Sequence, residues 1–159
     1  MDCEWFPGGK IFLLSYKKGN DFTKTLCGSS LERFPGILRK AKPKFVFVYG
    51  PDIAYLDRFY KEDFRNDFIC VNALKMSKEL IKSDSHRLCR IEKKLGIKRE
   101  VKKYKENIFS IWKDWRDEKL KTMIIEYNIQ DVDSLYLIVR HCIKKFNLKE
   151  TDIMRYMLK

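Results

Sequence analysis

The longest uninterrupted helical pattern lies near the carboxyl end of the chain. Residues 120–142 contain no proline or glycine, and a stripe of mostly apolar residues recurs there every three or four positions. The stripe comprises Leu120, Ile124, Tyr127, Asp131, Leu135, Ile138 and Cys142. This period predicts a helix that packs one face on the core. Asp131 is the acid on that face, so we expect a cation, a proton or strong hydrogen-bond donors to meet its carboxylate.

The first residues of the chain show the shorter period of β-strands. Residues 2–5 alternate in character, which places Asp2 and Glu4 on the same side of an extended strand. A turn at residues 7–9 and strands over residues 10–17 and 22–27 would complete an antiparallel meander. Two carboxylates on one face of a strand can converge on a metal ion, and the alternative is a frayed acidic N-terminus.

Farther along, helices and buried strands alternate, as is typical of a parallel sheet. We predict strands over residues 45–49 and 67–72. Helices are expected over residues 31–41, where Pro35 and Gly36 can interrupt the helix, and over 73–81, 86–95 and 150–158. Asp52 comes directly after the first of these strands, at the start of another helix. An acid there can stabilise a helix dipole, but open α/β sheets also place ligands at this edge.

Length, cysteine content and hydropathy limit the class of protein. A chain of 159 residues suits one domain, which we take as residues 1–159. The five cysteines are an odd number without a CxxC pair, so neither a disulfide framework nor a zinc site is predicted. No apolar run has membrane-spanning length and no signal segment opens the chain, so we expect a soluble cytoplasmic protein of undetermined oligomeric state.

The chain carries a formal net charge of +12, which favours a polyanionic partner such as nucleic acid. A charged surface rich in Lys and Glu also occurs in proteins from hot environments. The densest basic run is residues 98–105, and Tyr104, Trp112 and Trp115 are candidate stacking surfaces for bases. A solvated loop is the alternative for this run. The candidate nucleic-acid-binding residues are Lys98, Arg99, Lys102, Lys103 and Tyr104. The two histidines, His86 and His141, lack a metal-ligand spacing, and His86 is expected on the solvent side.

The acidic candidates come from three distant parts of the chain. Asp2 and Glu4, Asp52, and Asp131 would repel one another if gathered, unless divalent cations neutralised them. Tyr127 lies one helical turn before Asp131, on the same face. Two-metal phosphodiester hydrolysis needs this kind of arrangement, with ions ~3.5 to 4 Å apart.

These residues stand in segments that resemble known motifs, and each motif alone is a weak signal. DCE resembles a D-x-E first motif, VYGPDIAYL a second motif, and EYNIQDV a third motif of the form Y-x-x-x-D. LCRIEKKLGIKR resembles the helix-to-loop segment in the branch related to ribonuclease H-like predicted exonucleases. In this order, and over nearly the whole chain, they resemble the DEDD (DnaQ-like) 3′–5′ exonuclease superfamily of the ribonuclease H-like fold.

The resemblance implies an α/β fold of the ribonuclease H-like type. The central mixed β-sheet, an antiparallel meander followed by parallel strands, would be flanked by helices. It also implies that Asp2, Glu4, Asp52 and Asp131 hold two Mg²⁺ or Mn²⁺ ions and that Tyr127 orients or activates the attacking water. Glu126 stands where the family's histidine variant has its histidine, so the tyrosine form is indicated.

The leading hypothesis is therefore a metal-dependent 3′–5′ exonuclease that acts on single-stranded DNA or RNA. One alternative is a catalytically weakened nucleic-acid-binding protein that keeps this fold, because a fold alone does not establish activity. Another is a structure-specific endonuclease.

Overall fold

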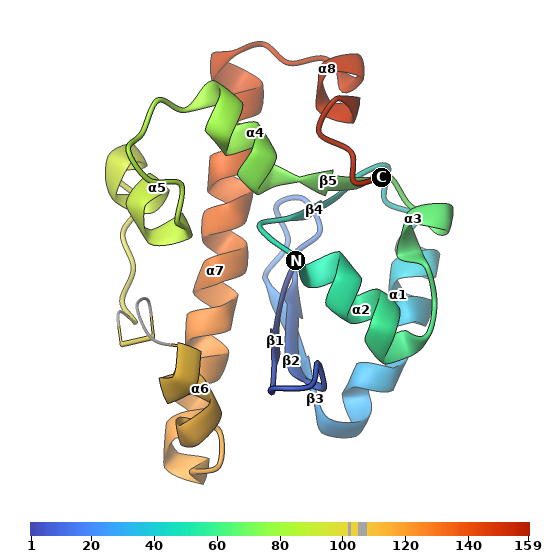
Figure 1. Ribbon diagram of the computed structural model, residues 1–159, viewed down its shortest axis with the longest axis vertical. Helices are drawn as coiled ribbons and strands as arrows, with labels where there is room; N and C mark the ends of the chain where they lie inside the picture. The colour runs from blue at the N-terminus through green and yellow to red at the C-terminus, as the bar shows by residue number, and fades with distance from the viewer. Residues whose placement is uncertain (102, 105–107) are drawn as a thin grey trace.

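A computed structural model describes residues 1–101, 103–104 and 108–159 of the chain, and shows a layer of strands between two groups of helices (Figure 1). One sheet is antiparallel, with the strand order β1-β2-β3. Its strands are β1 (Asp2–Trp5), β2 (Ile11–Tyr16) and β3 (Lys24–Cys27). The other sheet pairs β4 (Val46–Val48) with β5 (Cys70–Asn72) in parallel. The predicted α/β fold, in which an antiparallel meander precedes parallel strands, is confirmed.

The helices divide between the two faces of this strand layer. They are the 3₁₀ helix η1 (Gly28–Arg33), α1 (Phe34–Ala41), α2 (Asp52–Tyr60), α3 (Phe64–Asp67), α4 (Ala73–Leu80), α5 (Leu88–Leu95), α6 (Ile108–Asp114), α7 (Glu118–Lys145) and α8 (Glu150–Met154). In Figure 1, α1, α2 and α3 lie on one side, and the long α7 lies on the other side with α4, α5 and α6. Among the described residues, no helix is long and apolar enough to span a membrane.

Each face of the strand layer has its own apolar core. Cys3 and Leu14 point to the side of α1 and α2, where they join a cluster with Phe34 and Leu56. The neighbouring residue Leu13 points the opposite way and packs with α6 and α7. This alternation is the two-residue period of a strand, and it turns the even-numbered residues of β1 toward α7.

β1 lies between the two sheets. Its ladder with β2 pairs Asp2 with Ser15 and Glu4 with Leu13. On its other side, the amino nitrogen of Met1 donates to the carbonyl oxygen of Phe47, 2.9 Å away, in β4. The start of β1 is therefore held beside the parallel strand whose carboxyl end leads into α2.

The local sequence accounts for the ends of the helices. Asp117 caps α7 by accepting a hydrogen bond from the backbone nitrogen of Lys119, at 2.9 Å. Asn72 caps α4 in the same way through Lys75. Gly96 ends α5 with φ of 71°, the left-handed conformation that glycine adopts without steric cost.

Several predicted boundaries are corrected by the structure. Pro35 does not interrupt a helix, because it lies in the first turn of α1, where a missing N–H costs no hydrogen bond. The strand predicted over residues 67–72 is shorter, since α3 extends to Asp67 and β5 begins at Cys70. Helix α6 was not predicted, because the basic run before it suggested a loop.

Candidate metal centre

Three carboxylates meet where β1 faces α7. Asp2 and Glu4 project from alternate positions of β1, and Asp131 projects from the core face of α7. Each offers one oxygen, and these oxygens all lie within 4.8 Å of one another. Glu4 and Asp131 are only 6% and 7% exposed. The strand and helix periods predicted which faces carry these acids. The packing of β1 against α7 then brings together residues more than a hundred positions apart in the sequence.

Burial and mutual repulsion make the ionised cluster unfavourable by itself. Burial is the main cause that raises the pKa of Glu4 to about 8, and the neighbouring carboxylates raise it further. Burial also raises the pKa of Asp131 to about 6, against the opposing effect of the Arg99 guanidinium. The pKa of Asp2 is raised well above its ordinary value by burial and by the surrounding acids. A divalent cation would favour the ionised forms of all three.

The donor set suits a hard divalent cation. Carboxylate oxygens are the ligands that Mg²⁺ and Mn²⁺ prefer in proteins. Asn128 lies one turn before Asp131 and is fully buried, and its Nδ2 donates to Asp2 Oδ2 at 2.6 Å and to Glu4 Oε1 at 3.5 Å. The other amide atom, Oδ1, is buried without a hydrogen-bond partner among the described residues. Three converging carboxylates, two of them buried, fit a metal ion.

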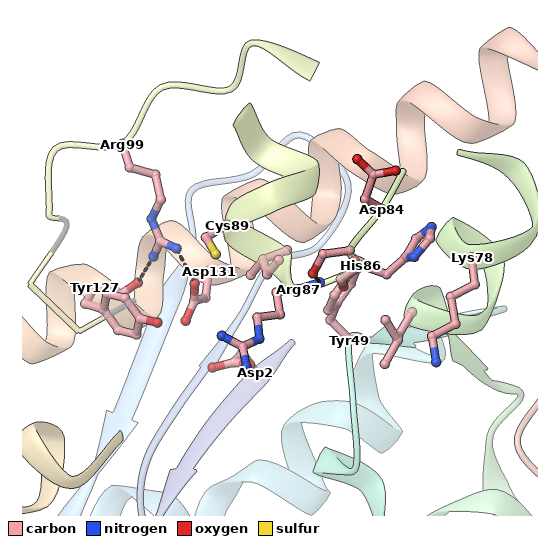
Figure 2. A pocket seen from close by; sticks show the side chains of 13 residues that line it. Asp2, Tyr49, Lys78, Asp84, His86, Arg87, Cys89, Arg99, Tyr127 and Asp131 are labelled. Atoms are coloured by element: carbon pink, nitrogen blue, oxygen red, sulfur yellow. Dashed lines mark hydrogen bonds and ion pairs between the residues drawn. The ribbon is translucent and has the colours of Figure 1, made fainter. Parts of the chain in front are cut away.

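Asp131 also has a protein cation beside it. Arg99 Nη1 donates to Asp131 Oδ1 at 2.6 Å and to Glu92 Oε1 at 3.0 Å. Arg99 Nη2 donates to the carbonyl oxygen of Tyr127 at 2.9 Å. The dashed lines in Figure 2 mark the contacts of Arg99 with Tyr127 and Asp131. The side chains of Arg99 and Glu92 are 2% and 1% exposed, so this is a buried ion pair in which both charges are compensated.

Tyr127 lies next to both charges of this pair. Its ring lies 4.6 Å from the Arg99 guanidinium carbon, and its hydroxyl is among the groups that lower the pKa of Asp131 by hydrogen bonding. Burial, followed by the charges of Asp131 and Glu4, raises the pKa of Tyr127 above its ordinary value. The phenol therefore keeps its proton at neutral pH and acts as a hydrogen-bond donor at the centre.

Asp52 lies near the cluster but outside the group of oxygens that defines it. It is 3% exposed, and its Oδ1 accepts hydrogen bonds from the backbone nitrogen of Cys3 at 3.1 Å and from Cys3 Sγ at 3.4 Å. Its charge is a cause of the raised pKa of Asp2, which places the two carboxylates close together. Asp52 thus ties the backbone of β1 at Cys3 to the start of α2.

The basic run is largely engaged with the protein itself. Lys98 is exposed, whereas Lys103 pairs with Asp114 at 2.7 Å. Tyr104 is 2% exposed and donates to Asp114 Oδ2, which corrects the expectation that it presents a face for stacking. Arg99 is buried at the acidic cluster, so it is not the exposed nucleic-acid-binding residue that the basic run suggested. Lys102 lies outside the described residues.

The tryptophans near this run are packed against the strand layer. Trp112 Nε1 donates to the carbonyl oxygen of Trp5 at 2.7 Å, and the Trp115 ring lies 4.7 Å from that of Phe12. Both are thereby tied to the hairpin of β1 and β2. Both side chains are half-buried against the sheet, so part of each ring that the sequence offered as a stacking surface is covered.

A cleft opens over the acidic cluster. It has a volume of about 570 Å³, and Asp2 and Asp131 line one side of it. The other side comes from α4 and the segment that leads into α5, which bring Lys78, His86 and Arg87 to the cleft (Figure 2). Figure 2 shows Arg87 extending toward Asp2. Acids that suit a metal ion thus face cations that suit a phosphate group.

His86 is not the solvent-side residue that the sequence suggested. It is half-buried, and its Nε2 lies 3.0 Å from the carbonyl oxygen of Ile81. His141 is half-buried near the far end of α7, and no cluster with metal-ligand geometry among the described residues includes either histidine.

Three residues at the centre were missed from the sequence, or were given another role. Asn128 shares the face of Asp131 at a spacing of three residues, and that spacing was the signal that could have found it. Glu92 is a buried acid that follows Ile91 on the packed side of α5, and such an acid requires a partner. Arg99 was taken as part of a basic surface because charge patterns do not show which cation turns inward.

Comparison with protein families gave a match over most of the chain. A family model described as RNase_H superfamily matches residues 12–143, a span that includes Asp52, Arg99, Tyr127 and Asp131. The searches of curated proteins and of solved structures gave no significant match.

Proposed function

The chain belongs to the RNase H superfamily, and from this premise we propose that it is a metal-dependent nuclease that hydrolyses phosphodiester bonds. The observation that carries the proposal is the convergence of Asp2, Glu4 and Asp131 oxygens within 4.8 Å of one another, beside an open cleft that Asp2 and Asp131 line. The RNase H superfamily suggests a nuclease, and the three converging carboxylates, of which Glu4 and Asp131 are buried, would supply ligands for a divalent ion.

In this proposal the chain's own residues have distinct tasks. Asp2, Glu4 and Asp131 would hold Mg²⁺ or Mn²⁺, which supplies Lewis-acid stabilisation of a phosphoryl oxygen and activation of water. Asn128 orients the two carboxylates of β1 through its amide nitrogen. Tyr127 holds its proton at the phenol oxygen and orients the water that attacks the phosphorus atom. Arg87 and Lys78 bind the phosphate backbone from the opposite side of the cleft.

We propose more specifically that the substrate is single-stranded DNA or RNA and that cleavage proceeds from the 3′ end. The ordered acidic motifs and the tyrosine four residues before Asp131 support this exonuclease form. The open cleft beside Asp2 gives a strand end access to the carboxylates.

The test uses a single-stranded oligonucleotide labelled at its 5′ end, incubated with the protein and Mn²⁺ or with EDTA. Stepwise shortening from the 3′ end that requires Mn²⁺ is expected. Asp131→Asn should abolish it while circular dichroism shows an unchanged fold, because the amide is a poor metal ligand. Internal cuts would instead indicate an endonuclease. Metal-independent cleavage, or full activity of Asp131→Asn, would contradict the proposal.

A second candidate is a nucleic-acid-binding protein with little or no catalysis. The engagement of Asp131 Oδ1 by Arg99 favours it, because an ion pair at 2.6 Å weakens a carboxylate as a metal ligand. Binding of the same oligonucleotide without cleavage in either Mg²⁺ or Mn²⁺ would support this candidate over the nuclease.

A further inference from the structure

We propose that Arg99 takes the place of a second metal ion, so that the centre binds one divalent cation per chain. The inference deepens the proposed function, because it concerns the metal content of the same site. It starts from the buried contact between Arg99 Nη1 and Asp131 Oδ1, in which a guanidinium charge lies against a carboxylate of the three-acid cluster.

The first step concerns which side of the Asp131 carboxylate a metal ion can approach. Its Oδ1 accepts the 2.6 Å hydrogen bond from Arg99, so the direction toward Arg99 is already filled by a positive charge. Charge-assisted hydrogen bonds of this length are among the stronger ones in proteins. A divalent ion on that side would also be repelled by the guanidinium across a poorly solvated space. The side that faces Asp2 and Glu4 is the one open to an ion.

The second step is the supply of other ligands. A further ion would need carboxylates besides the three that converge, and the nearby candidates are Asp52 and Glu92. Asp52 Oδ1 is bound to the backbone nitrogen and the thiol of Cys3. Glu92 Oε1 is bound to the same Arg99 nitrogen as Asp131, at 3.0 Å. Both carboxylates thus have protein partners in the places they occupy.

The third step is that Arg99 is fixed in place. Besides its two carboxylate partners, it donates to the carbonyl oxygen of Tyr127 at 2.9 Å and lies over the Tyr127 ring. With a side chain only 2% exposed, it cannot leave the cluster without stranding a charge in the interior. An arginine held by four separate contacts is a permanent cation of the site.

The consequence for chemistry is a division of tasks between an ion and a guanidinium. Two-metal enzymes use the second ion to offset charge on one of the two oxygens in the displacement. A guanidinium can offset phosphate charge by hydrogen bonding, but it cannot lower the pKa of a bound water as a metal does. The chain would therefore use one ion together with Arg99.

The experiment counts bound ions. Mn²⁺ is titrated into the metal-free full chain by calorimetry, and free Mn²⁺ is followed by electron paramagnetic resonance. The wild-type chain is expected to bind one ion. Arg99→Met removes the guanidinium charge and its hydrogen bonds to Asp131 Oδ1 and Glu92 Oε1, so it is expected to bind two. Lys98→Met, the adjacent exposed cation, is the matched control and should bind one.

Two ions bound to the wild-type chain would overturn the proposal, and this measurement does not depend on any variant. A folded Arg99→Met chain that still binds one ion would overturn the assignment of Arg99. If Arg99→Met does not fold, Arg99→Gln replaces it, because its amide can still donate a hydrogen bond in the interior while the carboxylates of Asp131 and Glu92 are kept. It is likewise expected to bind two ions, and a folded Arg99→Gln chain that binds one would overturn the assignment of Arg99. The stoichiometry is read without substrate, so an inactive protein that binds one ion would refute the proposed function and leave this inference standing.

Discussion

At the scale of single residues, the centre is defined by acids whose charges the fold disfavours. Glu4 shows this most clearly, because burial raises its pKa from 4.5 to about 8. A carboxyl group whose pKa is raised by folding stabilises the folded state fully below its unfolded pKa, and loses that contribution as the pH rises through its folded pKa. The metal-free protein should therefore lose stability between pH 4.5 and about 8.

The corresponding prediction concerns Glu4→Gln. In EDTA, the melting temperature of the wild-type chain should fall as the pH approaches about 8, and that of Glu4→Gln should fall less, because an amide does not ionise. Saturating Mn²⁺ should reverse the fall for the wild type and have little effect on Glu4→Gln. Thermal denaturation followed by circular dichroism checks both. Glu32→Gln, at an exposed position, is the control. Parallel pH profiles for the wild type and Glu4→Gln would show that burial does not raise the pKa of Glu4.

Tyr127 gives a second prediction at this scale. Its phenol stays protonated because burial and the charges of Asp131 and Glu4 raise its pKa, so its hydroxyl serves as a donor. Tyr127→Phe should slow hydrolysis at saturating Mn²⁺ by ~10² to 10⁴ if the hydroxyl assists proton transfer or orients water. Single-turnover cleavage measures the rate, and calorimetry should show unchanged Mn²⁺ affinity.

Tyr104→Phe is the matched control for Tyr127→Phe. The two rings pack edge to face with centroids 5.6 Å apart, but the hydroxyl of Tyr104 bonds to Asp114, away from the carboxylate cluster. Its cleavage rate should remain close to that of the wild type. Equal rates for Tyr127→Phe and the wild type would reduce Tyr127 to a packing residue.

At the scale of elements, the centre depends on how β1 is held against α7 and α2. β1 is short, and one of its edges is fastened by Asp52, whose Oδ1 accepts from the backbone nitrogen of Cys3. The two carboxylates of β1 keep their positions only while that edge stays in place. Asp52 therefore acts on the metal centre through the position of a strand.

Asp52→Asn should give different results if Asp52 is a metal ligand than if it holds β1 in place through its hydrogen bond to Cys3. The amide oxygen can still accept the hydrogen bond from Cys3, so Asp52→Asn should keep its fold and bind Mn²⁺ nearly as the wild type does. Asp52→Ala leaves a buried N–H without a partner, which costs about 1 to 3 kcal/mol and should weaken Mn²⁺ binding. Urea denaturation and calorimetry measure the two effects. A large loss of Mn²⁺ affinity in Asp52→Asn, with stability unchanged, would make Asp52 a ligand instead.

Much of this element structure could be predicted from hydrophobic periods. The stripe that contains Ile124, Leu135 and Ile138 predicted α7, and the alternation of residues 2–5 predicted which side of β1 carries the acids. Periodicity assigns each side chain to a face of its own element. It does not show which residue of another element lies opposite, and for that reason Asp131 was identified as a buried acid without its partner Arg99, 32 positions away in the chain.

Asp52 shows the same limit of prediction from sequence. The sequence placed it correctly after β4 and at the start of α2, and the structure confirms both positions. Whether its carboxylate turns to the cluster or to the backbone of β1 depends on the lateral spacing of strands that do not neighbour each other in the sequence. No local pattern contains that information.

At the scale of the whole molecule, the chain has a net charge of +12, and only some of its cations are available to a ligand. Arg99 forms a buried ion pair with Asp131, and Lys103 is paired with Asp114. The exposed cations that line the cleft over the acidic cluster are Lys78 and Arg87. A polyanion that reaches the carboxylates must pass between them and the cluster, so they should contribute to binding more than cations elsewhere on the surface.

The prediction is that Lys78→Ala combined with Arg87→Ala weakens binding of a single-stranded oligonucleotide and flattens its salt dependence. Each lost phosphate contact on a single strand should reduce the slope of log K against log salt by about 0.7. Fluorescence anisotropy in EDTA, with salt as the variable, measures binding without cleavage. Lys93→Ala combined with Lys94→Ala is the control, because it removes the same charge from exposed positions of α5 that do not line the cleft. If both double variants reduce the slope equally, binding follows net charge alone and the cleft has no privileged role. A reduction confined to the cleft variant would show that the strand's phosphates run along the wall opposite Asp2 and Asp131.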